Sequence, residues 1–120
     1  MKRLSIVMIL LFLSSLFTAT VFAADAFDLT IPLPLTGKPA KFGEIMKRSY
    51  EIAVEEINAK GGVKGKKIAL SFEDSTGKPE IARSIVEKMI DSKKQPIIVG
   101  EYTSACAKAV AAVAEERKTP

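Results

Sequence analysis

Histidine is missing from this 120-residue sequence, and cysteine occurs once, as Cys106. Without histidine, the chain cannot assemble a Ser-His-Asp triad, a Cys-His pair or most zinc sites. A single cysteine excludes both an intrachain disulfide and a cysteine-rich metal site. An enzyme built from this sequence would depend on carboxylates or lysines alone. We therefore expect no metal, no other cofactor and no catalytic residue.

Basic residues outnumber acidic residues by only a small margin. The chain has 18 lysines and arginines against 14 aspartates and glutamates, and two of the basic residues are Lys2 and Arg3 at the N-terminus. The remaining lysines are scattered, with no arginine cluster and no accompanying row of aromatic residues. The charge pattern therefore does not favour nucleic acid as a partner.

The N-terminal segment has the pattern of a secretory signal peptide. Lys2 and Arg3 precede an apolar run over residues 4–17, and small residues follow at Val21 and Ala23. The alternative, a membrane anchor, needs about 20 apolar residues, which is longer than this run. We expect residues 1–23 to be a signal peptide that is removed after Ala23, and the mature protein to be located in the periplasm.

Three strand–helix pairs follow in order. Alternating apolar residues predict strands over residues 27–33 and 67–73, and an unbroken apolar run predicts a buried strand over residues 96–100. Helical patterns cover residues 42–60, residues from Pro79 through Ile90, and residues from Thr103 or Ser104 to about Arg117. This alternation predicts an α/β fold with a parallel sheet and flanking helices in three layers. Because another strand is due after residue 120, we expect residues 24–120 to be part of a larger domain.

Three local patterns suggest chemistry, but each has a simpler structural interpretation. Residues 61–66 (GGVKGK) resemble a phosphate-binding loop, yet they follow a helix and precede a strand, which is the reverse order, so we interpret them as a helix end and a turn. Glu73 and Asp74 point to opposite faces of a strand and do not converge, although one of them can cap the next helix or line a crevice. Cys106, near a helix start, is either a reactive thiol with a lowered pKa or, as we favour, a small packed hydrophobic residue.

The loop over residues 101–106 is the most informative candidate site. It follows the predicted buried strand and opens a helix, where free backbone N–H groups and the hydroxyls of Thr103 and Ser104 can bind a carboxylate. The alternative is that one of these hydroxyls only caps the helix. Residues 35–42 form the second candidate wall, unless Phe42 belongs to the core. The candidate ligand-binding residues are Phe42, Tyr102, Thr103, Ser104 and Ala105.

Four segments, taken together, resemble the leucine/isoleucine/valine-binding branch of the type I periplasmic binding proteins. The run INAKGGV near the end of the first predicted helix is the most specific of them. The resemblance extends over residues 27–120 without a gap. The segments are residues 32–43 (PLPLTGKPAKFG), 55–63 (EEINAKGGV), 71–75 (SFEDS) and 99–104 (VGEYTS).

The resemblance implies a fold of two α/β lobes that close on a ligand, with this chain at the start of the N-terminal lobe. It implies a strand order that begins 2-1-3, which brings the two candidate loops together at the carboxyl ends of the strands. It also implies that Ser104 holds the ligand's α-carboxylate and that Phe42 covers the ligand. Some members of the family pair two cysteines at the positions of Thr76 and Thr103, so we expect looser loops here.

The resemblance further implies an extracytoplasmic solute-binding protein of an ABC importer, with a permease in the inner membrane as its partner. The expected ligand is a branched-chain amino acid or a related carboxylate; an amide, urea or aromatic acid is the alternative within the family. A small flavodoxin-like enzyme or phospho-acceptor domain is the alternative from another class. That class favours an acidic cluster at the end of the first strand, where this sequence has residues 31–34 (IPLP). A purely structural exported domain also remains open.

Overall fold

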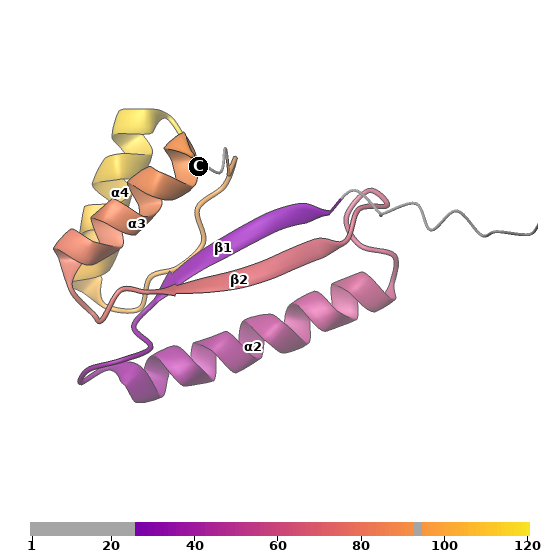
Figure 1. Cartoon of the computed structure of the whole chain (residues 1–120), viewed down its shortest axis with the longest axis horizontal. Coiled ribbons are helices and arrows are strands. Elements are labelled where there is room, and N and C mark those ends of the chain that lie inside the picture. The colour runs from indigo at the N-terminus through magenta and orange to yellow at the C-terminus, as the bar shows by residue number, and fades with distance from the viewer. Residues whose placement is uncertain (1–25, 93–94) are drawn as a thin grey trace, which may run out of the picture.

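The computed structural model describes residues 26–92 and 95–120, so the predicted signal peptide lies outside the described residues. Five elements follow one another along the chain (Figure 1). None of the helices in the described ranges is both long and apolar enough to cross a membrane. The elements are β1 (Phe27–Leu33), α2 (Ala40–Ala59), β2 (Ile68–Asp74), α3 (Pro79–Asp91) and α4 (Ser104–Arg117).

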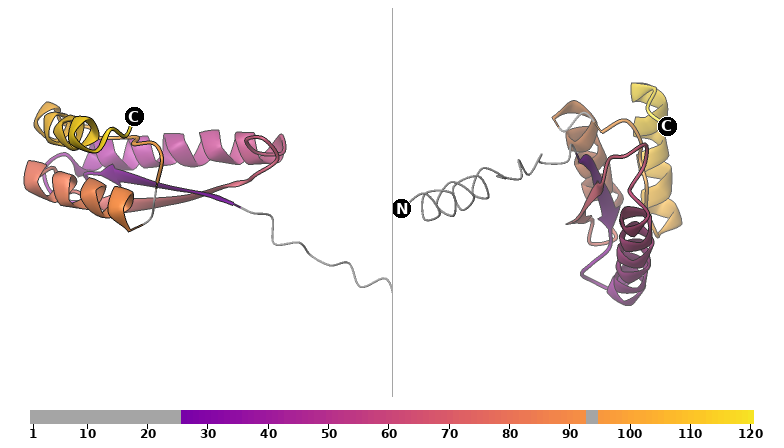
Figure 2. Two further views of the ribbon diagram at one scale, coloured as in Figure 1. Left: turned by 90° about the horizontal axis from the view of Figure 1, so that it is seen from above. Right: turned by 90° about the vertical axis from the view of Figure 1, so that its right-hand side faces the viewer.

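The two strands form a parallel pair, in register from Phe27 opposite Ile68 to Leu33 opposite Asp74. Neighbouring residues of β2 show which helix covers each face, because successive side chains of a strand point to opposite sides. The Phe72 ring lies below the ammonium group of Lys47 on α2, whereas Glu73 pairs with Lys88 on α3. Helices α2 and α3 therefore cover opposite faces of the sheet (Figure 2). This confirms the predicted three layers and the parallel pairing.

The predicted third strand, residues 96–100, is wrong: this segment runs beside β1 without regular secondary structure. The reason lies at the free edge of β1. The buried Gln95 side chain accepts a hydrogen bond from the Thr30 amide (2.8 Å) and donates one to the Thr30 carbonyl (3.1 Å), where a neighbouring backbone would bind. Pro32, the next residue facing this edge, has no N–H to donate. Even so, the segment lies close to β1. A Cβ added to Gly100 would be only 2.7 Å from the Pro32 carbonyl oxygen, which shows how closely the two backbones approach.

The main core lies between α3 and α4. The helical spacing of Ala82, Ile85, Val86, Met89 and Ile90 predicts one apolar face, and the burial of the first four in α3 confirms it. Three buried residues of α4, which are Cys106, Val110 and Val113, complete the cluster. Because burial of each large aliphatic side chain contributes about 1.5–3 kcal/mol, this cluster fixes how α4, and therefore its first turn, is placed.

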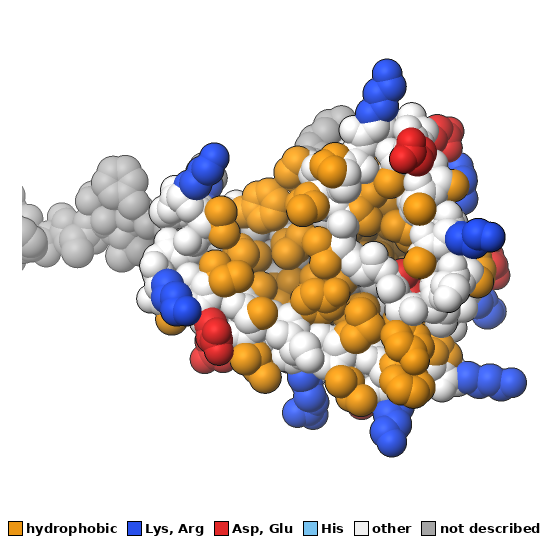
Figure 3. All heavy atoms as spheres, turned by 180° about the vertical axis from the view of Figure 1, so that it is seen from behind, with side chains coloured by type: hydrophobic (Ala, Val, Ile, Leu, Met, Phe, Trp, Pro, Cys, Tyr) orange, Lys and Arg blue, Asp and Glu red, His pale blue; other side chains and the backbone are white. Residues whose placement is uncertain are grey.

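Helix α2 is less buried than its sequence pattern predicts. Gly43 and Val54 are its only buried residues, whereas Ile45 and Ile52 are 54% and 58% exposed. The helical spacing of Met46, Tyr50, Ala53 and Ile57, widened by Ile45 and Ile52, predicts an apolar stripe, which therefore only partly contacts the sheet. Hydrophobic side chains remain accessible on the face of the molecule opposite to the view of Figure 1 (Figure 3). At the end of this helix, Gly61 has a positive φ of 102°, which confirms the predicted glycine stop.

Candidate functional site

The two predicted loops meet through an aromatic contact. Phe42 lies in the first turn of α2, and Tyr102 lies two residues before α4. Their rings stack, with centroids 4.8 Å apart and planes inclined by 11°. Phe42 is 49% exposed, so it is not a core residue. The structure thus brings the loop after β1 and the loop before α4 together, as the resemblance implies, although the third strand of the implied order is not formed.

The first turn of α4 decides which hydroxyl caps the helix. The Thr103 hydroxyl accepts a hydrogen bond from the Cys106 amide at 3.2 Å, so Thr103 is the N-cap. Within residues 95–120, the structure shows no hydrogen bond from the amides of Ser104 and Ala105 or from the Ser104 hydroxyl. These unpaired donors at a helix N-terminus form a site with the right polarity for a carboxylate.

Asp74, the last residue of β2, holds the loop that follows β1. One carboxylate oxygen accepts hydrogen bonds from the amides of Leu35 (2.8 Å), Thr36 (3.2 Å) and Thr76 (2.8 Å). The other oxygen accepts a hydrogen bond from the Thr36 hydroxyl at 2.5 Å. Burial by itself raises the pKa of Asp74, but the hydrogen bonds from Thr36, Thr76 and Leu35 outweigh it and lower that pKa below the ordinary value. Asp74 therefore acts as an ionised clamp.

Ser75, the next residue, connects to the other loop. Its hydroxyl donates a hydrogen bond to the Glu101 carboxylate, and the second oxygen of that carboxylate accepts the Tyr102 amide at 2.8 Å. Ser75 is fully buried. The expectation of looser loops in the absence of a disulfide therefore overlooks this contact, which joins the turn containing Thr76 to the segment just before Thr103.

Two other predicted features have structural roles. Glu73 and Asp74 diverge as expected, with Glu73 turned toward Lys88 at 3.3 Å and Asp74 toward the loop after β1. Cys106 is completely buried, and burial, together with the nearby charge of Glu101, raises the pKa of its thiol in spite of the hydrogen bond with Thr103. The packed interpretation of Cys106 is thus confirmed. Among the described residues, no three His, Cys, Asp or Glu side chains gather as metal ligands.

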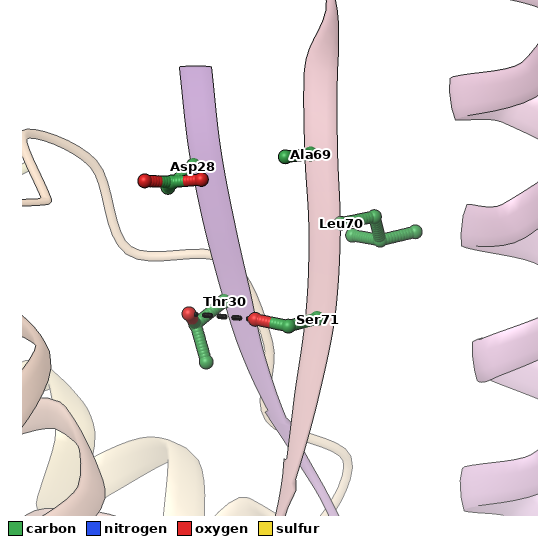
Figure 4. Close-up of a pocket in the computed structure, with 5 residues that line it drawn as sticks. All are labelled: Asp28, Thr30, Ala69, Leu70 and Ser71. Atoms are coloured by element: carbon green, nitrogen blue, oxygen red, sulfur yellow. Dashed lines mark hydrogen bonds between the residues drawn. The ribbon is translucent and has the colours of Figure 1, made fainter. Parts of the chain in front are cut away.

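A separate hollow of about 380 Å³ lies against the strands and does not include any of the predicted site residues (Figure 4). Two of its polar side chains satisfy each other, since the Thr30 and Ser71 hydroxyls are hydrogen-bonded at 2.9 Å. We therefore place the candidate site at the α4 N-terminus and the Phe42–Tyr102 stack. The lining residues of the hollow are Asp28, Thr30, Ala69, Leu70 and Ser71.

Sequence reasoning missed Ser75 and Glu101. Both belong to segments that were singled out, SFEDS and VGEYTS, but neither residue type at those positions signals a contact between distant loops. Only the placement of α4 against α3 brings Glu101 to the end of β2.

A profile of the periplasmic binding protein family matches residues 30–120. The chain belongs to this family. A Leu/Ile/Val-binding protein homolog 3 from Brucella melitensis is 40% identical over 104 residues, a match that covers 83% of this chain and 28% of the relative. The chain thus spans little more than a quarter of that relative's length.

Solved structures of periplasmic binding proteins share this fold. The branched-chain amino acid substrate-binding protein LivJ from Streptococcus pneumoniae, in complex with isoleucine, superposes with a TM-score of 0.75 at 27% identity, covering 80% of this chain and 28% of that one. A solute-binding protein of an ABC transporter from R. palustris, in complex with benzoate, has a TM-score of 0.70 at 28% identity, covering 79% of this chain and 26% of that one.

Proposed function

We propose that this chain is the opening part of an exported two-lobed solute-binding protein of an ABC importer, and that it is not an enzyme. Its ligand is a small carboxylate with an apolar body, and a branched-chain amino acid is the first candidate. The protein is delivered to the periplasm by residues 1–23 and passes its ligand to an inner-membrane permease. The observation that carries this proposal is the set of unpaired donors at Ser104 and Ala105, beside the stacked rings of Phe42 and Tyr102.

Each group has a distinct part in binding. The amides of Ser104 and Ala105 and the Ser104 hydroxyl hold the ligand's carboxylate, because a helix N-terminus favours an anion by roughly 0.3–2 kcal/mol. Thr103 orients these amides by capping the helix. The rings of Phe42 and Tyr102 form the apolar surface against which the apolar body of the ligand packs.

The binding free energy that these groups can supply is too small without further contacts from a second lobe. A charge-assisted hydrogen bond from Ser104 contributes about 1.5–3 kcal/mol, and burial of an apolar side chain against Phe42 contributes at most about 1.5–3 kcal/mol. With the helix N-terminus, the upper limits reach about 8 kcal/mol, before association costs that begin near 4 kcal/mol. Micromolar affinity needs a net of about 8.2 kcal/mol. The missing contacts must come from a second lobe, consistent with relatives of which this chain covers 28%.

Calorimetry tests this proposal directly. The complete polypeptide that carries this sequence is titrated with leucine, isoleucine, valine and benzoate, and residues 24–120 alone are titrated in parallel. We expect saturable micromolar binding of a branched-chain amino acid by the complete polypeptide and none by residues 24–120. Micromolar binding by residues 24–120 alone would mean that this chain holds a whole site.

An aromatic carboxylate is the second candidate ligand. The observation in its favour is the flat, half-exposed aromatic surface of Phe42 and Tyr102, together with the benzoate bound to the R. palustris relative. Binding of benzoate in preference to leucine in the same titrations would select this candidate.

Export is tested separately from binding. N-terminal sequencing of the protein recovered from the periplasm should begin at Ala24. An intact Met1 in a membrane fraction would contradict a cleaved signal peptide.

A further inference from the structure

The turn that follows β2 contacts both loops of the candidate site. Asp74 binds the amides of Leu35 and Thr36 in the loop after β1, and Ser75 binds Glu101 in the loop before α4. The Ser75 amide also donates to the Leu33 carbonyl at 2.9 Å, which anchors the turn to β1. Asp74 and Ser75, which are adjacent at the end of β2, thus hold one loop each.

Each of these contacts lies next to one of the stacked rings. The loop held by Asp74 leads into α2, whose first turn contains Phe42. The carboxylate held by Ser75 belongs to Glu101, and Tyr102 is the next residue. Packing against the sheet and against α3 places α2 and α4, which follow the two loops. The hydrogen bonds of Asp74 and Ser75 hold the loops themselves, next to each ring. The turn after β2 therefore contributes to the position of one ring relative to the other.

We infer that Asp74 and Ser75 are positioning residues, which set the spacing of Phe42 and Tyr102 and so preorganise the ligand-binding wall. Both hydrogen-bond sets involve a carboxylate, and such charge-assisted bonds are shorter and stronger than neutral ones. Holding the wall in place before binding removes part of the ordering cost that a ligand would otherwise meet. The consequence for affinity rests on the proposed function, whereas the consequence for the two rings does not.

The test compares Ser75→Ala and Asp74→Asn with Glu73→Gln, in the complete polypeptide. Glu73→Gln is the matched control, because it makes the same carboxylate-to-amide change one residue away, in a side chain that pairs with Lys88 on α3. Nuclear Overhauser contacts between the Phe42 and Tyr102 rings report the spacing, and calorimetry with leucine and benzoate reports affinity. We expect the two positioning variants to lose the ring contacts and to bind about tenfold more weakly, with the control unchanged.

A double-mutant cycle then separates positioning from general stability. If Ser75 acts through Glu101, the Ser75→Ala/Glu101→Ala double variant has ring contacts and affinity no worse than the more damaged single variant. Ring contacts and leucine affinity that persist in Ser75→Ala, while its unfolding midpoint falls, would overturn the inference. So would additive effects in the cycle.

Two complications are possible: Asp74→Asn can fail to fold, and the wild-type polypeptide can fail to bind either ligand. If Asp74→Asn does not fold, Thr36→Val removes a single hydroxyl donor to the same carboxylate with little change of shape, and it should weaken the ring contacts as well. If the wild-type polypeptide binds neither leucine nor benzoate, the proposed ligands are wrong. The ring contacts then decide the inference alone, and it fails if they survive Ser75→Ala.

Discussion

Phe42 and Tyr102 stack nearly parallel, with ring centroids 4.8 Å apart, although Phe42 lies in the first turn of α2 and Tyr102 lies in the segment between α3 and α4. The contact leaves 49% of Phe42 and 41% of Tyr102 exposed. Aromatic pairs of this kind contribute about 0.5–1.5 kcal/mol beyond the area that they bury. The stack therefore helps to join the two loops and still leaves an apolar surface available to a ligand.

Removal of the Phe42 ring should expose Tyr102. Residues 24–120 contain two tyrosines and no tryptophan, so in a polypeptide of these residues a Tyr50→Phe background leaves Tyr102 as the reporter. In that background, Phe42→Leu should increase acrylamide quenching of tyrosine fluorescence, because the stacked partner is gone. The Tyr50→Phe protein with Phe42 intact serves as the control, because it keeps the stacked ring and adds no second tyrosine to the signal. Equal quenching in both variants would show that the stack does not shield Tyr102 in solution.

Thr103 and Ser104 should differ in what their hydroxyls do. Thr103→Ala removes the N-cap and should lower the free energy of unfolding by about 1 kcal/mol in urea denaturation. Ser104→Ala should leave stability nearly unchanged and weaken leucine binding by the complete polypeptide about tenfold, since a hydrogen bond to a charged group is lost. A loss of stability in Ser104→Ala as large as its loss of binding would contradict a role in ligand binding.

The ionised clamp at Asp74 predicts a specific dependence of stability on pH. Because its hydrogen bonds hold the pKa of Asp74 below the value of about 3.9 expected in an unfolded chain, ionisation stabilises the folded state at neutral pH. That contribution is complete above the unfolded pKa and disappears as the pH falls through the lower, folded value. Urea denaturation from pH 7 down to pH 2 should therefore show Asp74→Asn less stable than wild type at neutral pH, and the difference should vanish in acid. A difference that is constant across this range would contradict the clamp.

Cys106 should react slowly with thiol reagents in the folded state. It is fully buried, and its raised pKa reduces the fraction of thiolate at pH 8. Cys106 is the only cysteine in residues 1–120, and peptide mapping of the labelled protein identifies its reaction with a disulfide reagent. We expect labelling to be about tenfold slower or more in buffer than in urea. Equal rates would show that the contact between α3 and α4 opens readily.

The order and type of most elements follow from local sequence. Alternation over residues 27–33 predicts a strand with the bounds that β1 has, and Pro79 marks the first residue of α3. The apolar face of α3 and the glycine stop after α2 are likewise readable, because they depend on periodicity and on backbone preferences that each residue carries with it. The family resemblance, which the profile match confirms, rests on the same short segments.

What local sequence cannot supply is the outcome of competition between groups that are distant in the chain. Residues 96–100 have the composition of a buried strand, but the Gln95 side chain occupies the Thr30 backbone groups that such a strand needs. Thr103 and Ser104 are equally plausible caps until the first turn of α4 assigns the role to Thr103. The sequence by itself therefore determined the α/β alternation, the family and the two candidate loops. The tertiary structure alone decided that Asp74 and Ser75 join those loops, because hydrogen-bond partners across a fold are set by packing and not by spacing along the chain.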